Sequence, residues 1–107
     1  MSQASQAQRI ERIQEMEAAF DAASQAVQEF DAALAKFKRS QARVGKLGAY
    51  YGSADWFADR DAYEAGQLPA DLKCGVLGED VPYDVLISYH DLAIRMLECA
   101  TRALKEG

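Results

Sequence analysis

The sequence predicts an all-α protein: a helical bundle with a long N-terminal helix at about 6–45, a short helix at about 54–65 and a long C-terminal helix at about 80–105. Three observations predict this class. Neither glycine nor proline occurs before residue 45, apolar residues recur three and four apart in both long segments, and six of the seven glycines lie between residues 45 and 78. A chain of 107 residues has the length of one domain, 1–107, with one modest core.

The N-terminal helix is predicted from an uninterrupted apolar seam. Ser5 and Gln8 have the spacing of a capping box and mark its start. The apolar residues then alternate three and four apart, with a single gap at Gln41, which is a heptad pattern with a and d positions. The seam consists of Ile13, Met16, Phe20, Ala23, Val27, Phe30, Leu34, Phe37 and Val44.

The length of this helix has a consequence for assembly. At 1.5 Å per residue the N-terminal helix is about 60 Å long and the C-terminal helix about 40 Å, so the second cannot cover the first completely. We expect Ile13, Met16 and Phe20 to form an assembly surface that packs against a second copy of the chain or a protein partner.

The middle of the chain contains several residues that favour turns and helix ends. Ser53 is suited to cap the short helix, and Gly66 is suited to end it in the left-handed conformation. The pair Leu68-Pro69 predicts a turn, and residues 70–73 predict one helical turn. Pro82 fits the first turn of the C-terminal helix, whose amides lack acceptors within the helix.

The charges are segregated along the chain. Seventeen acids and twelve bases give a net charge of -5, which argues against a general nucleic-acid binder. Along the first helix, acidic residues come early and basic residues at 36–46 come late, an order that complements the helix macrodipole. Residues 55–91 are strongly acidic, and whether the two stretches pair internally or with a partner stays open.

Five aromatic residues fall within fourteen positions: Tyr50, Tyr51, Trp56, Phe57 and Tyr63. The simpler interpretation is a small core that pins the short helix onto the long ones. The alternative is a pocket for a ligand or partner. The indole and phenol groups each need a hydrogen-bond partner, and Asp59 is a candidate acceptor.

No motif in the sequence predicts a catalytic, metal or cofactor site. His90 is the only histidine, so a two-histidine zinc site cannot be built, and the glycines at 75 and 78 lack the lysine of a phosphate-binding loop. Cys74 and Cys99 are expected to be reduced thiols of a cytoplasmic protein. No export signal or membrane span is predicted.

One set of residues matches a known pattern: Leu47, Tyr50, Tyr51, Ser53, Trp56, Asp59, Gly66, Leu68, Pro69, Asp71, Leu72, Lys73, Gly75, Val76, Leu77, Glu79 and Asp80, with Arg12, Met16 and Glu17 before them. In these residues the chain resembles the bacterial domain of unknown function 4298 family. It departs from that pattern at Gly78, where a serine would give the last helix a side-chain cap. The resemblance implies a cytoplasmic helical protein of bacteria and supplies no activity.

We therefore expect a non-enzymatic interaction or scaffold protein that forms a homo-oligomer, such as a dimer, through its first helix. The alternative is a regulatory module whose acidic middle docks a basic protein surface or mimics nucleic acid. A third hypothesis, a small-molecule or catalytic pocket around Trp56, requires a closed pocket that contains a titrating side chain such as Asp59 or His90.

Overall fold

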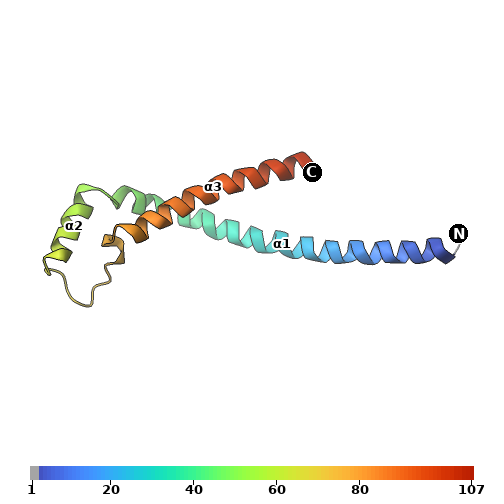
Figure 1. The fold of residues 1–107 in the computed structure, drawn as a ribbon, viewed down its shortest axis with the longest axis horizontal. Helices are drawn as coiled ribbons and strands as arrows, with labels where there is room; N and C mark the ends of the chain where they lie inside the picture. The colour runs from blue at the N-terminus through green and yellow to red at the C-terminus, as the bar shows by residue number, and fades with distance from the viewer. Residues whose placement is uncertain (1–2) are drawn as a thin grey trace. The chain divides into compact units, whose positions relative to one another are not determined.

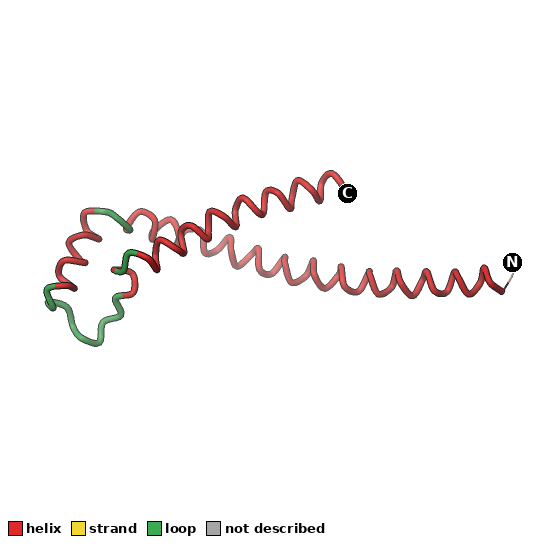
Figure 2. The backbone as a smooth tube through the Cα atoms, viewed as in Figure 1, coloured by secondary structure: helices red, strands yellow, loops and turns green. Residues whose placement is uncertain are grey.

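A computed structural model describes residues 3–107 of the chain, and its elements are all helical. They are α1 (Gln3–Tyr50), α2 (Ala54–Glu64), the short 3-10 helix η1 (Gly75–Leu77) and α3 (Asp80–Glu106), with no strand among the described residues (Figure 1). The loops lie between Tyr51 and Glu79 (Figure 2). The predicted all-α class and its three principal helices are confirmed. Internal contacts divide the chain into two units, Met1–Gln41 and Ala42–Gly107, which are described separately.

The first unit consists of the N-terminal part of α1. Its large apolar side chains at Ile10, Ile13, Met16, Phe20, Val27 and Phe30 are all about half exposed or more. A single helix has no second layer against which to bury an apolar face. This part of α1 therefore has no core of its own.

Both ends of α1 lie beyond the predicted limits. The helix begins at Gln3, so Ser5 lies inside it and the predicted capping box does not start it. It continues through Gly45 and Gly48 to Tyr50, because a glycine within a helix costs only about 1 kcal/mol relative to alanine. The chain leaves the helix where Gly52 adopts a φ of 77°, a conformation that side chains disfavour.

The charges of α1 are not placed at its ends. No acidic residue occupies its first turn and no basic residue its last turn. The macrodipole acts mainly within the terminal turns. The prediction that the charge order complements the dipole is therefore wrong, and the segregation of acids and bases along α1 needs another explanation.

The limits of α2 agree with the prediction. Ser53 caps the helix, since its Oγ accepts a hydrogen bond of 3.2 Å from the backbone amide of Trp56. At the other end Gly66 has a φ of 71°, and its amide donates to the carbonyl of Tyr63 at 3.1 Å. A serine cap and a left-handed glycine thus delimit this helix as the sequence indicates.

The connection from α2 to α3 differs from the prediction. No helix forms over residues 70–73, where a single turn is closed by the Leu72 amide donating to the Pro69 carbonyl at 3.1 Å. Helical structure forms later, in η1, whose Leu77 is buried. Gly78 ends η1 and does not cap α3, because Glu79 holds the cap position without a side-chain hydrogen bond.

Helix α3 begins at Asp80 and has Pro82, buried, in its first turn, as predicted. Within the second unit it passes close to the last turns of α1: a Cβ built on Gly48 would lie 3.8 Å from Cδ2 of Leu86. η1 contacts both α2 and α3. The buried residues of this unit are Trp56, Leu77 and Pro82, so its core is centred on η1.

Candidate functional site

The indole of Trp56 is the centre of the aromatic residues in the second unit. It projects from the first turn of α2 and is 3% exposed. Its Nε1 donates a hydrogen bond of 3.0 Å to the backbone carbonyl of Val76 in η1. Asp59, the candidate acceptor for the indole and phenol groups, does not accept the indole proton, because that acceptor lies twenty residues further along the chain.

Aromatic rings and a guanidinium enclose the indole. The ring of Tyr51 lies 5.1 Å from that of Trp56 at 64°, and the ring of Phe57 lies 5.0 Å away at 78°, both edge-to-face arrangements. The Cζ of Arg60 lies 5.4 Å from the indole centroid, within cation–π range. We call Tyr50, Tyr51, Trp56, Phe57, Asp59 and Arg60 the Trp56 cluster.

Tyr50 and Asp59 form the shortest hydrogen bond of this cluster. The phenol of Tyr50, the last residue of α1, donates to Oδ2 of Asp59 in α2 at 2.6 Å. Because this bond requires the phenol proton, it raises the pKa of Tyr50 from 10.0 to about 12. Asp59 is thus an acceptor for a tyrosine, as the sequence suggested for one of the polar aromatic tips.

Glu79, the residue before α3, is held by the side chains of Tyr51 and Arg60. The phenol of Tyr51 donates to the backbone carbonyl of Glu79 at 3.0 Å. The guanidinium of Arg60 forms ion pairs with Glu79 at 2.7 Å and with Glu64 at 3.2 Å. Both hydrogen bonds raise the pKa of Arg60, and the bond to Glu79 has the larger effect.

The geometry favours a structural role for the Trp56 cluster. Trp56, Tyr50 and Tyr51 all donate their polar hydrogens within the protein, and the indole has no open face. The third hypothesis places a ligand beside Trp56, but the low exposure of this side chain leaves little of the indole accessible to a ligand. Tyr63 lies outside the cluster with its side chain exposed. Sequence reasoning missed Arg60, although its position four residues after Trp56 on one helix was a usable signal.

The residues proposed for assembly lie on the exposed seam of α1. Ile13, Met16 and Phe20 are 52%, 58% and 67% exposed in the single chain. Further along, the seam borders a shallow depression lined by Ala26, Val27, Gln28, Phe30, Asp31 and Leu34. The structure therefore presents a continuous apolar face on the first unit, and its partner stays a prediction.

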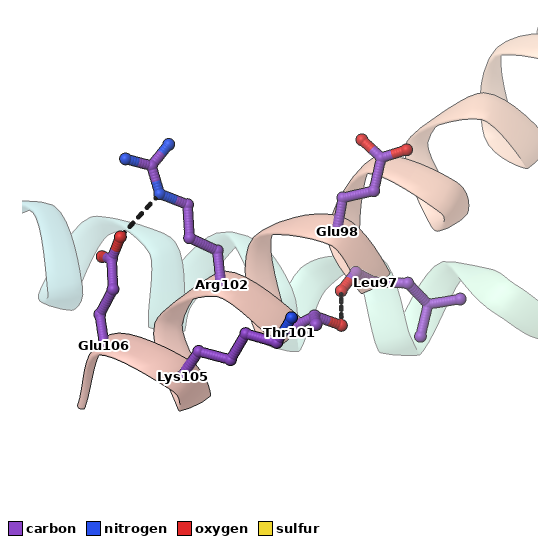
Figure 3. A pocket seen from close by; sticks show the side chains of 6 residues that line it. All are labelled: Leu97, Glu98, Thr101, Arg102, Lys105 and Glu106. Atoms are coloured by element: carbon purple, nitrogen blue, oxygen red, sulfur yellow. Dashed lines mark hydrogen bonds and ion pairs between the residues drawn. The ribbon is translucent and has the colours of Figure 1, made fainter.

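A second depression lies near the C-terminal end of α3, lined by Leu97, Glu98, Thr101, Arg102, Lys105 and Glu106 (Figure 3). Arg102 pairs with Glu106 at 3.0 Å, and the hydroxyl of Thr101 donates to the Leu97 carbonyl at 2.8 Å. These groups spread along one helix rather than converge on a point, so they do not define a ligand site.

The residues considered for metal or thiol chemistry are scattered. Over the described residues, no three His, Cys, Asp or Glu side chains gather where they could hold a metal ion. His90 is exposed on α3. Cys74 and Cys99 are both free thiols, one half-buried and one exposed. Among residues 3–107, no helix has the length and apolar composition needed to cross a membrane.

The fold and these sites define a small all-α protein with a long helix and a compact, aromatic-centred second unit. The family model described as Domain of unknown function (DUF4298) matches residues 13–99, and the chain belongs to this family. The match covers the Trp56 cluster and the seam from Ile13 onward. No curated protein and no solved structure matches the chain.

Proposed function

We propose that this protein is a non-enzymatic interaction protein of the bacterial cytoplasm that self-associates, as a dimer, through the apolar seam of α1. The exposure of that seam carries the proposal. Phe20 is 67% and Val27 69% exposed in the single chain. Large apolar residues that recur at a and d positions over several heptads are typical of a helix that packs on another helix.

Helix length supports the same function. Helix α1 has 48 residues and α3 has 27, or about 70 Å against about 40 Å. The shorter helix cannot shield the whole length of the longer one. A second copy supplies the missing cover and buries the seam on both chains at about 25 cal/mol per Å² of apolar surface.

The acidic regulatory module is the second candidate, and one observation favours it. Of the nine acids between residues 55 and 91, only Glu64 and Glu79 form ion pairs within the described residues, both with Arg60. Arg43 and Lys46, in the same unit, pair with none of them. Apart from Asp59, which accepts the hydrogen bond from Tyr50, the remaining carboxylates can contact a basic protein surface, and such binding should weaken as salt is raised.

A substitution in the seam tests self-association. Phe20→Asp places a charge on the a/d face, and we expect dimer formation to weaken by at least about ten-fold, measured by sedimentation equilibrium. Ala18→Asp is the matched control, since it introduces the same charge two residues away on the opposite face. Equal dimerisation of both variants and the wild type would place the contact outside the seam and contradict the proposal.

A further inference from the structure

We propose that Ala23 is the position on α1 that receives Phe20 of a second copy, twice over, in an antiparallel pair of helices. This inference rests on the proposed self-association and adds the contact that sets the orientation of the two copies. The residues that carry it, 13–30, all lie in α1 and in the first unit. The choice depends on the sizes and exposure of apolar side chains and not on charge.

The part of the seam that is free to pair ends near Phe30. Between Ile13 and Phe30 the large apolar side chains are 52–69% exposed. Leu34 and Phe37 are half-buried in the single chain, and Phe37 already has an interaction within it. A second copy therefore has six a and d positions to cover, which are Ile13, Met16, Phe20, Ala23, Val27 and Phe30.

The sizes of these six residues are uneven. Phe20 and Phe30 carry the largest side chains, and Ala23 between them carries the smallest. In a parallel dimer in register each residue meets its own copy, so a layer of two phenylalanines borders a layer of two alanines. Two helices at one spacing cannot fit both layers, because the first is overpacked or the second leaves a gap.

One antiparallel alignment makes the layers even. In an antiparallel pair, a residues pack against d residues of the other helix, and the alignment centred between residues 21 and 22 covers the whole free seam. Its layers, each formed twice, are Phe20 with Ala23, Met16 with Val27, and Ile13 with Phe30. No layer then holds two phenylalanines or two alanines, so one helix spacing suits all of them.

The depression in the seam fits this alignment. Four of the residues that line it have the i, i+3, i+4 and i+7 spacing of a hole that receives one side chain of a facing helix: Val27, Phe30, Asp31 and Leu34. In the antiparallel alignment the side chain level with this hole is Ile13 of the second copy. In a parallel pair in register it is a second Phe30.

Sliding the antiparallel helices by one heptad loses this fit. In one direction Phe30 lies opposite Gln6, so an aromatic ring meets a polar side chain. In the other direction Phe20 lies opposite Phe30, which restores an overfilled layer. The same shift sets Ile13 opposite Phe37, which is already half-buried in its own chain.

The positions that flank the seam permit this alignment without deciding it. On one flank Ala19 lies beside Ala26 of the second copy, and such small side chains let two helices approach closely. On the other flank Glu17 lies beside Ser24, so no like charges meet. A parallel pair sets Arg12 beside Glu17, but an exposed ion pair contributes little to stability. The fit of the apolar layers therefore decides the orientation.

Enlarging Ala23 tests the contact. In the antiparallel pair Ala23→Phe sets two phenylalanines in one layer at two symmetric places, so the dimer dissociation constant should rise at least about ten-fold by sedimentation equilibrium. In a parallel pair the same change fills the gap at residue 23, and an equal or lower dissociation constant would overturn the proposal. Ala18→Phe, on the opposite face of α1, is the matched control and should leave the dissociation constant unchanged.

Spin-label distances give a second readout on the full chain, with Cys74 and Cys99 replaced by serine. Labels on Ala22→Cys should lie within about 30 Å of each other in either orientation and report that a dimer exists. Labels on Ala7→Cys should lie about 45 Å apart if the helices are antiparallel and less than about 25 Å apart if they are parallel. A short distance at residue 7 overturns the antiparallel contact alone. The absence of any distance between copies at residue 22 overturns self-association through α1 itself.

Discussion

The phenol of Tyr50 donates a 2.6 Å hydrogen bond to the carboxylate of Asp59, and this bond joins the last residue of α1 to the middle of α2. Between them the chain turns at Gly52 and starts again at the cap Ser53. The bond therefore fixes the position of α2 after a turn that glycine would otherwise leave adaptable.

The Tyr50–Asp59 bond predicts a pH dependence of stability. The folded-state pKa of Tyr50 is raised from 10.0 to about 12, so the bond stabilises the protein fully below pH 10 and is lost as the pH rises through 12. Tyr50→Phe should lower the melting temperature at neutral pH. The difference in melting temperature between this variant and the wild type should close as the pH rises through the folded-state pKa of about 12. Thermal unfolding followed by circular dichroism at several pH values measures this gap. A constant gap at all pH values would show that the phenol bond is not its cause.

Trp56 should dominate the stability of the second unit. Trp56→Ala removes the largest buried side chain and should cost about 3–5 kcal/mol in the free energy of unfolding, measured in urea by circular dichroism. Trp56→Phe keeps an aromatic ring but leaves the Val76 carbonyl without its donor, so we expect a smaller loss of about 1–3 kcal/mol. A Trp56→Ala variant as stable as wild type would contradict the enclosed geometry of the cluster.

The glycines should divide into two classes. Gly52 and Gly66 have positive φ angles, so replacing either with alanine should destabilise the protein by about 1–2 kcal/mol. Gly45 lies inside α1 with nothing within 4 Å of a built Cβ, so Gly45→Ala should stabilise it by about 0.5–1 kcal/mol. Urea unfolding measures all three variants. Similar effects at the three positions would mean that α1 does not continue through Gly45.

Arg60 should not be replaceable by lysine. Its guanidinium contacts Glu79, Glu64 and the Trp56 ring together, a geometry that a lysine ammonium cannot reproduce. Arg60→Lys should lower the melting temperature, with a smaller difference at high salt. Arg102→Lys is the matched control, because Arg102 forms only an exposed pair within one helix turn, and it should leave the melting temperature unchanged.

Local signals in the sequence predict much of the fold. The Ser53 cap, the left-handed Gly66 and Pro82 in the first turn of α3 act within a few residues of their own positions, and all are confirmed. The end of α1 is different, because Gly45 resembles a helix terminator locally while the helix continues to Tyr50. At Gly48 a residue distant in sequence lies close to the helix, since a built Cβ would be 3.8 Å from Cδ2 of Leu86, and no local pattern encodes such a contact.

The Trp56 cluster is predictable in membership but not in connectivity. Its aromatic residues are close in sequence, which places them together. The acceptor for the indole is a backbone carbonyl twenty residues away, and the partner of Arg60 that lies outside α2 is Glu79, nineteen residues away. Such contacts depend on how the loop returns to α2, which no local pattern encodes. Asp59 was correctly identified as an acceptor, but its donor is Tyr50.

Sedimentation equilibrium of the wild-type chain over a wide range of concentrations tests the central claim most directly. Self-association through the α1 seam predicts that the measured mass rises with concentration from that of one chain to that of two and then levels off. A mass of one chain at every concentration, up to the millimolar range in which weak dimers form, would contradict it.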